Sequence, residues 1–370
     1  MKKLTVIAVT AAMVMSMQSV AMAGVFENPV EKPEEITVTG INGDVCGWYT
    51  DVALTEEEIA QVKEMGISLA YDMPNESEFS EAVLNGLKNA CEVYGIELAG
   101  TAVCENDPAV QKENLENFMA LGVDYVLSQA QEVDLAAASY DPLRDAGIKL
   151  IFQGNYPTGY KVGEDCCASQ YEDYASYGVF CADALAEALN YEGKVAAITM
   201  SAVNQVANSR DQAFIERIKT YENIEFVEEA GIEQVSDTGT VASALLTRHP
   251  DLTGLYVTFV EPATEALEVV RGLNMTDLKM VTNDFNSIAV LDMVQGGNVC
   301  SFAVDRPWAI GELMVTLAAN DALGKELEHS CYLDPVTIAD MDNLEIEWKG
   351  GFGTELPDEI KTVIAEMETE

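Results

Sequence analysis

The chain has 370 residues, of which 63 are Asp or Glu and only 20 are Lys or Arg, so its formal net charge at pH 7 is −43. Such an acidic surface repels nucleic acid and anionic lipid headgroups, so we exclude both as partners held by charge. Hydrophobic residues make up 48% of the chain and recur periodically, so the acidity does not indicate disorder.

The first 23 residues have the layout of a secretory signal peptide. Lys2 and Lys3 precede an apolar run over 4–17, and Ala21-Met22-Ala23 supplies small residues at the positions that signal peptidase reads. We therefore predict cleavage after Ala23. An uncleaved membrane anchor is the alternative, but the run is short of the roughly 20 residues that a membrane-spanning helix needs. No cysteine follows the run, so we expect no lipid anchor at this site.

Residues 24–54 look irregular, and from Thr55 onward short apolar runs alternate with segments of helical periodicity. In the first half we expect helices at 55–65, 79–94, 109–121 and 135–146, and strands at 67–71, 96–103, 125–128 and 149–152. Residues 154–170, rich in Gly, Tyr and Asp, are expected to cross to a second unit.

The same alternation restarts beyond residue 170. Here we expect helices at 171–190, 210–220, 238–248, 264–273, 287–295 and 308–323. The strands between them are expected at 194–200, 224–228, 255–259, 279–282 and 299–304.

Strands that alternate with helices predict a parallel sheet covered on both faces, and about ten strands are too many for one small open sheet. We therefore predict an α/β protein with two Rossmann-like lobes. The predicted division is a signal peptide (1–23), an N-terminal extension (24–65), a first lobe (66–168 plus 305–332), a second lobe (169–304 plus 333–345) and a C-terminal tail (346–370).

Polar side chains follow most of the predicted strands. Ligands of open parallel sheets bind beyond the carboxyl ends of the strands, so these side chains are candidates for a cleft between the lobes. Loops are polar in any protein, which is the competing explanation for each residue taken singly. The candidates are Asp72, Gln131, Gln153, Asn155, Glu261, Asn283, Asp284 and Asp305.

Eight cysteines allow 105 disulfide connectivities, and the sequence does not choose among them. An oxidising compartment permits disulfides, but Cys91 and Cys300 lie in apolar segments and look like core residues. Two unpaired thiols are the favoured reading of the adjacent Cys166 and Cys167. No C-x-x-C pair occurs, so we expect no zinc site and no thioredoxin-type site.

Catalytic signatures are absent from the sequence. There is no Walker loop, G-x-G-x-x-G, G-x-S-x-G or H-E-x-x-H motif, and neither His249 nor His329 follows a predicted strand. We therefore expect no enzyme, no cofactor and no metal. Two cleft carboxylates could still hydrolyse a glycoside, which keeps a secreted glycosidase as a minor alternative.

Several segments between residues 67 and 340 resemble the type I periplasmic sugar-binding proteins, the ribose-binding-like group. They are a strand-forming stretch at 146–151, an R-x-x-x-F helix start at 210–214, an L-x-x-x-P-D stretch at 246–251, an acidic strand end at 261–263, and Asp284 with Asp305-Arg306-Pro307. The order and spacing of these segments carry the resemblance. It implies three hinge strands between the lobes and a sugar bound in the cleft.

The resemblance also implies roles for individual residues. Phe79 would stack on a sugar ring, and Asn155 would make a polar contact on the hinge side. Arg210 would donate a fork of hydrogen bonds to the hydroxyl groups of the sugar. Asp284 and Asp305 would accept hydrogen bonds from such hydroxyl groups. Simpler roles remain open: Phe79 in the core, Arg210 in a surface ion pair, and Asp284 as the cap of the next helix.

The function implied is that of a periplasmic solute-binding protein, a monomer that delivers a small polar ligand, a sugar or sugar-like molecule, to an ABC permease. A sensory or chemotaxis receptor for the same ligands is the first alternative, because both classes use the same lobe surface. The effector domain of a transcriptional repressor is disfavoured, since the sequence has a signal peptide and lacks a basic DNA-binding segment.

Overall fold

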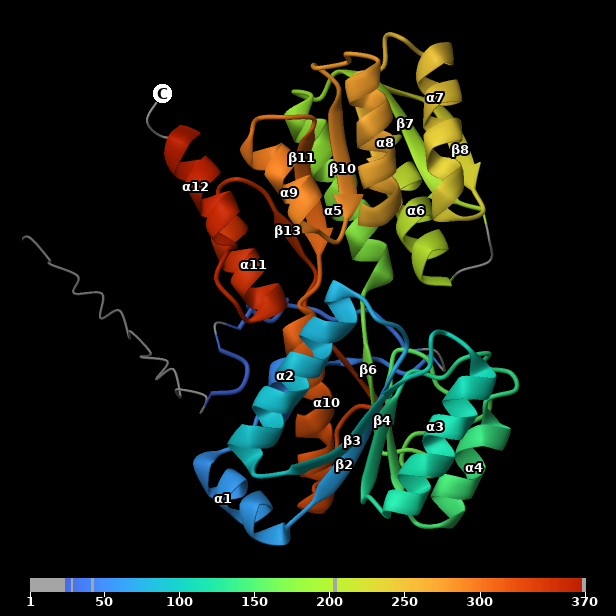
Figure 1. Cartoon of the computed structure of the whole chain (residues 1–370), viewed down its shortest axis with the longest axis vertical. Helices are drawn as coiled ribbons and strands as arrows, with labels where there is room; N and C mark the ends of the chain where they lie inside the picture. The colour runs from blue at the N-terminus through green and yellow to red at the C-terminus, as the bar shows by residue number, and fades with distance from the viewer. Residues whose placement is uncertain (1–23, 28, 41–42, 202–204, 368–370) are drawn as a thin grey trace, which may run out of the picture.

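The computed structural model describes residues 24–27, 29–40, 43–201 and 205–367. These residues form two lobes, one above the other along the longest axis (Figure 1). Each lobe is an open sheet with helices on both faces, so the predicted α/β fold of two Rossmann-like lobes is confirmed. The predicted signal peptide, 1–23, lies outside the described residues.

The first lobe is built on a seven-stranded sheet in which every neighbouring pair of strands is parallel. The strands run in the order β1 (Gly47–Trp48), β12 (Cys331–Leu333), β6 (Ala168–Tyr171), β5 (Lys149–Gln153), β4 (Tyr125–Ser128), β2 (Ser68–Met73) and β3 (Glu97–Val103).

Helices cover both faces of this sheet, as its apolar strands require. On β2, Leu69 and Tyr71 pack into the core beneath α2 (Glu78–Tyr94) and α10 (Pro307–Ala322), while Ala70 faces the opposite core. That second core lies under α3 (Pro108–Leu121) and α4 (Ala137–Asp145). Gly95 and Gly122, both left-handed, end α2 and α3 as predicted.

The second lobe has a six-stranded sheet. Its order is β13 (Thr337–Ala339), β11 (Val299–Val304), β10 (Lys279–Asn283), β9 (Gly254–Val257), β7 (Gly193–Met200) and β8 (Ile224–Ile232). The five strands β7 to β11 are parallel as predicted, and the edge strand β13, which was not predicted, is antiparallel to β11. The reason is that β11 ends at the hinge, where β13 begins, so Val304 pairs with Thr337.

Five helices cover the second sheet. On one face lie α5 (Tyr174–Ala188) and α6 (Gln205–Ile218), and on the other α7 (Thr238–Arg248), α8 (Val260–Gly272) and α9 (Ser287–Val294). The 3-10 helix η2 (Val235–Asp237) leads into α7. The predicted tail forms α11 (Leu344–Phe352) and α12 (Asp358–Met367), which bury Trp348 and Ile360 against this lobe.

Three segments of the chain join the lobes. The first runs from β6 to α5, the second from β11 to α10, and the third from β12 to β13. Figure 1 shows β6 leading up from the lower sheet into the upper lobe. This is the predicted three-strand hinge, and the polar side chains on it form the site described below.

The predicted N-terminal extension packs into the first lobe. Val25 and Phe26 are buried between α2 and α10, where the Phe26 amide donates to the Glu312 carboxylate at 2.8 Å. The segment continues through β1, η1 (Tyr49–Val52) and α1 (Glu56–Met65). A disulfide between Cys46 and Cys331 ties it to β12. Cys166 and Cys167 are unpaired thiols, as are Cys91 and Cys300.

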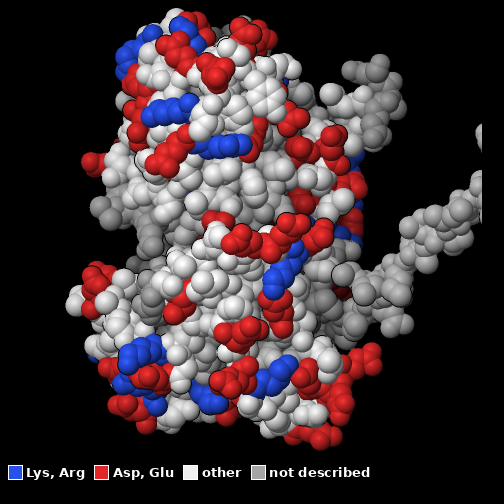
Figure 2. Space-filling model, turned by 180° about the vertical axis from the view of Figure 1, so that it is seen from behind, with Lys and Arg blue, Asp and Glu red and all other residues white. Residues whose placement is uncertain are grey.

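Acidic side chains are spread over both lobes on the face seen from behind, and they outnumber the basic ones there (Figure 2). In the described part of the chain, no helix combines the length and the hydrophobicity that crossing a membrane demands.

Candidate functional site

Each of the three hinge segments carries a buried carboxyl group where a strand ends. Glu172 follows β6, Asp305 follows β11 and Asp334 follows β12, with 7%, 4% and 1% of their surfaces exposed. The three strands all end at the hinge, so their next residues meet between the lobes. The Asp334 carboxylate accepts from the Gln170 amide at 2.5 Å.

Arg210 brings a cation to this cluster from helix α6 of the second lobe. Its Nη2 lies 3.5 Å from Oε2 of Glu172, and its Nη1 lies 3.3 Å from Oδ2 of Asp284. The guanidinium carbon is 3.8 Å from the centre of the Tyr177 ring, and the Tyr177 hydroxyl donates to Glu172 at 3.1 Å. Only 8% of Arg210 is exposed, so the alternative of a surface ion pair does not apply.

Close packing of two helices fixes the position of Arg210. Helix α5 passes α6 at Gly178, where an added Cβ would lie 2.0 Å from the Arg210 carbonyl oxygen and 2.5 Å from the Phe214 nitrogen. Only glycine allows this approach.

Asp284 follows β10 with a left-handed backbone, φ +61°, which Asp tolerates better than most residues. Its amide donates to the Ala303 carbonyl at 2.8 Å, which holds the turn against β11. The alternative role as a helix cap is taken by Asn286, whose side chain accepts from the Ala289 amide at the start of α9.

Several buried polar atoms in this cluster have no hydrogen-bond partner among the residues that the structure describes. They are Arg210 Nε, Asp284 Oδ1, Asp305 Oδ2, Asp334 Oδ2 and Gln170 Oε1. Buried polar groups are otherwise almost always paired, so this concentration at one place indicates that something else completes the bonds.

Burial dominates the electrostatics of the cluster. It raises the pKa of Glu172, although the Arg210 charge opposes the shift. The pKa of Asp305 is raised well above its ordinary value by burial and then by the neighbouring Glu172 and Asp284. Burial and the same two neighbours, Glu172 and Asp305, raise the pKa of Asp334. Three carboxyl groups therefore interact with one another, and the Arg210 guanidinium opposes the pKa shift of two of them, Glu172 and Asp305.

Of the seven residues predicted for the site, the structure brings Arg210, Asp284 and Asp305 together. Glu261, in the first turn of α8, has its pKa raised by burial and by the charges of Asp284 and Glu78. Because Glu78 begins α2 of the first lobe, Glu261 marks where the rims of the two lobes face each other.

The remaining three predicted residues lie on the first lobe, away from the carboxyl cluster. Phe79 is in the first turn of α2, half-buried against the core of that lobe. Gln131 follows β4, and its backbone amide donates to the side-chain oxygen of Gln111 at 2.9 Å. Asn155 follows β5, and its backbone carbonyl accepts from the backbone amide of Ala130 at 3.0 Å. All three sit past the carboxyl edge of the first sheet, the edge that faces the hinge.

Three further strand-end candidates are used inside their own lobes. The Asp72 carboxylate is fully buried and accepts from Gln111 and Asn114, each at 2.8 Å. Gln153 accepts from the Tyr71 hydroxyl at 2.9 Å. The Asn283 amide donates to the Thr258 carbonyl at 2.7 Å. These residues form hydrogen bonds within their own lobes, at the ends of the strands.

Sequence analysis missed Glu172, Asp334, Gln170 and Tyr177. The segment around Glu172 was predicted as the start of a helix at 171, whereas β6 occupies 168–171 and the helix begins at Tyr174. The signal that could have found Glu172 and Asp334 is the one used elsewhere, an acidic residue after a strand. Both strands are too short to show a periodicity.

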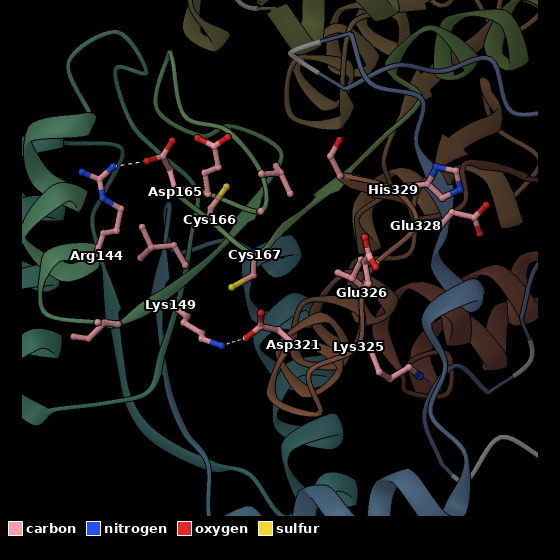
Figure 3. A pocket seen from close by; sticks show the side chains of 18 residues that line it. Arg144, Lys149, Asp165, Cys166, Cys167, Asp321, Lys325, Glu326, Glu328 and His329 are labelled. Atoms are coloured by element: carbon pink, nitrogen blue, oxygen red, sulfur yellow. Dashed lines mark hydrogen bonds and ion pairs between the residues drawn. The ribbon is translucent and has the colours of Figure 1, made fainter.

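A separate hollow of about 620 Å³ lies at the opposite, amino-terminal edge of the first sheet. Figure 3 shows Arg144 pointing to Asp165 and Lys149 pointing to Asp321 within it. The nitrogen–oxygen distances are 2.6 Å and 2.5 Å, so these cations are already paired. Burial raises the pKa of Cys166 and Cys167 to about 12, which keeps both thiols protonated and unreactive.

A protein family and several solved structures are similar to this chain. The family model described as "Periplasmic binding protein domain" matches residues 69–326. An ABC transporter solute binding protein from Agrobacterium vitis, solved with bound α-D-tagatopyranose, superposes with a TM-score of 0.65 at 19% identity, covering 75% of this chain and 96% of that one. A second, from Bacillus halodurans with bound myo-inositol, gives 0.63 at 18%, covering 76% and 96%. At such identities the similarity shows a shared fold.

One curated relative is also similar in sequence. The "Putative rhizopine-binding protein" of Rhizobium meliloti is 26% identical over 149 residues, which are 39% of this chain and 48% of that protein. The chain thus spans about half the length of the curated relative that it matches.

Proposed function

This chain belongs to the periplasmic binding protein domain family, and on that premise we propose that it is an extracytoplasmic solute-binding protein of an ABC importer. Its ligand is a sugar or another small polyhydroxylated molecule, bound where the hinge segments meet. The observation that carries the proposal is the hinge cluster, in which a guanidinium and several carboxyl groups have buried atoms without partners among the described residues.

The chemistry of the cluster suits such a ligand. A sugar has a polar rim of hydroxyl groups that both donate and accept, and weakly polar C–H faces. In our proposal Arg210 donates to hydroxyl oxygens while Asp284 and Asp305 accept from hydroxyl protons. Phe79, Gln131 and Asn155 would reach the ligand from the first lobe, and Glu261 from the rim of the second, once the lobes close.

Capture without turnover is part of the proposal. Crowded carboxyl groups could in principle act as an acid and a base, so a glycosidase is the rival activity. The family and the solved neighbours are binding proteins, which favours capture. Delivery to a permease, a periplasmic location behind a cleaved signal peptide and a monomeric state complete the proposed role.

A thermal-shift screen tests the function. The protein from residue 24 onward is melted with each of a set of monosaccharides and polyols, since a ligand that binds only the folded state raises the melting temperature. The protein is then incubated with a glycoside of each sugar that binds, and the release of free sugar is followed. We expect a raised melting temperature and no turnover. Hydrolysis of glycosides, or the absence of any hit in the whole set, would contradict the proposal.

A further inference from the structure

The hinge cluster holds more carboxyl groups than its one cation can balance in their ionised form. Glu172, Asp284 and Asp305 all act on the charge of Arg210, and a fourth carboxyl group, that of Asp334, interacts with Glu172 and Asp305. Two of them are within ion-pair distance of the guanidinium, at 3.5 Å and 3.3 Å. In the described part of the chain, Arg210 is the one cation at ion-pair distance from any of these carboxylates. The next residue after Asp305, Arg306, lies 3.2 Å from Glu347 in an ion pair of its own.

Within the cluster, the Asp305 carboxyl group has few neighbours that would stabilise its negative charge. Only 4% of its surface is exposed, and its Oδ2 has no hydrogen-bond partner among the residues described. After burial, the negative charges of Glu172 and Asp284 act on it most strongly, while Arg210 and the Tyr177 hydroxyl oppose them. A carboxyl group in such surroundings stays ionised only if a donor that carries positive charge reaches it.

A second, non-acidic group points to the same place. Gln170 is fully buried, its amide nitrogen donates to Asp334, and its Oε1 has no partner in the described chain. An amide oxygen is an acceptor only, so it calls for a donor as the carboxylate oxygens do. Among the open positions at the hinge are four acceptors, Asp284 Oδ1, Asp305 Oδ2, Asp334 Oδ2 and Gln170 Oε1, together with the donors Arg210 Nε and the Ser169 hydroxyl on β6.

We propose, on the basis of the function proposed above, that the ligand is cationic: a polyhydroxylated ring or chain that bears a protonated amine, seated against Asp305 and its neighbouring acceptors. An ammonium group has three donors and no acceptor, which matches this excess of acceptors. A neutral sugar brings hydroxyl donors but no positive charge that would hold these buried carboxyl groups in their ionised form. The hydroxyl groups of the aminated ligand would still use Arg210.

The test compares matched pairs that differ in the amine alone. The protein is titrated calorimetrically at pH 6.5 and 150 mM NaCl with D-glucose and D-glucosamine, D-galactose and D-galactosamine, and myo-inositol and an amino-deoxy-inositol. We expect the aminated member of the best-binding pair to bind at least tenfold more tightly than the neutral one. N-Acetylation of the amine, which removes the charge and keeps the position, should abolish that preference.

Two variants separate a local effect from the general acidity of the chain. In Asp305→Asn, which keeps the shape of the side chain, the preference for the aminated ligand should fall below about threefold. Asp183→Asn is the matched control, because Asp183 lies on the surface of α5 in an ion pair with Arg217. It lowers the total charge equally and should keep the preference. Melting of each unliganded variant confirms that it is folded.

The outcomes distinguish this inference from the function on which it rests. If neutral sugars or polyols bind as tightly as their aminated partners, or more tightly, the inference is overturned and the binding function stands. An equal loss of preference in Asp183→Asn would also overturn it, because long-range attraction would then explain the effect. If no compound of either kind binds, both the inference and the proposed function are contradicted.

Discussion

Arg210 and Asp284 reach one point from two elements of the second lobe, the helix α6 and the end of strand β10, and their Nη1 and Oδ2 atoms lie 3.3 Å apart. Arg210 also faces Glu172 of the hinge, so a single buried guanidinium joins the second lobe to the segment on which the lobes turn.

Arg210→Ala should therefore weaken ligand binding and also destabilise the unliganded protein. We expect at least a tenfold loss of affinity, which corresponds to about 1.4 kcal/mol. We expect an unfolding free energy lower by roughly 3–5 kcal/mol, because the variant leaves buried carboxylates without their cation. Calorimetric titration and urea unfolding measure the two effects.

Arg217→Ala is the control for this variant. Arg217 lies on the same helix in a half-exposed ion pair with Asp183, so its loss should cost less than about 1 kcal/mol and leave the affinity unchanged. Equal behaviour of the two variants would remove Arg210 from the site.

Asp284→Asn should reduce the affinity by at least tenfold with a smaller effect on stability. Asn tolerates the left-handed backbone at this position, so the variant keeps the turn and removes the charge. Asp284→Ala adds backbone strain and should destabilise the protein further. If Asp284→Asn bound the ligand as well as the wild type, the accepting role of Asp284 would be wrong.

Gly178→Ala should destabilise the second lobe by about 1–3 kcal/mol, because the new Cβ meets the Arg210 carbonyl oxygen at 2.0 Å in a well-packed interface. The shift of α6 should also weaken ligand binding, although Gly178 itself does not reach the site. Gly239→Ala is the matched control, since no atom lies within 4 Å of its added Cβ in helix α7. That substitution should be neutral or slightly stabilising, and equal losses in both variants would rule out the packing explanation.

Long, regular elements were predictable from the sequence. The strand at 299–304 and the helix at 238–248 match the structure residue for residue. Their apolar runs are long enough, or periodic enough, to determine the local structure. The two lobes followed from counting such strands.

The hinge was much less predictable, because its elements are set by tertiary pairing. Strand β1 has two residues, and β12 and β13 have three each, too few to show any period. Their hydrogen-bond partners lie far along the chain: Gly47 pairs with Tyr332 and Cys331 with Ser169. Arg210, Asp284 and Asp305 were found because predictable elements flank them. Glu172 and Asp334 were missed because their flanking strands are made by those distant partners.

Ligand binding should close the lobes about the hinge. Closure is a shift of population toward the state that the ligand prefers, and it brings the first-lobe residues Phe79, Gln131 and Asn155 toward the cluster. Solution X-ray scattering should show a smaller radius of gyration with the ligand found by screening and no change with a non-binding sugar. Tight binding at a constant radius would count against a hinged cleft.

The exported protein should begin at Gly24. This rests on the leader-like pattern of the first 23 residues, and N-terminal sequencing of protein recovered from outside the cytoplasm checks it. In the structure Val25 and Phe26 are buried, so they follow the predicted cleavage point almost at once. A secreted chain that still starts at Met1 would contradict the prediction.

Stability should depend on pH through Glu312. Burial raises the pKa of this carboxyl to about 7, although the Phe26 amide, the Trp308 indole and Asn89 donate to it. A carboxyl whose pKa is higher in the folded than in the unfolded chain contributes stability below its ordinary pKa, near 4.5. That contribution is lost as the pH rises toward 7.

Urea unfolding between pH 5 and pH 8 should therefore show the wild type losing stability relative to Glu312→Gln, in which the side chain stays neutral. The difference between the two proteins should level off above pH 7. Parallel curves for the two proteins across this range would mean that Glu312 titrates normally.

The route of the chain through the hinge also sets an order of assembly during synthesis. The first lobe starts near residue 25 but takes α10 and β12 from residues 307–333, and its disulfide joins cysteines 285 positions apart. Most of the second lobe is contiguous, from α5 to β11. The first lobe can therefore be completed by α10 and β12 only after nearly the whole chain has followed, although α2, α3 and α4 are available early. A chaperone that holds emerging chains would be needed most by the first hundred residues, even though they belong to the larger sheet of the finished protein.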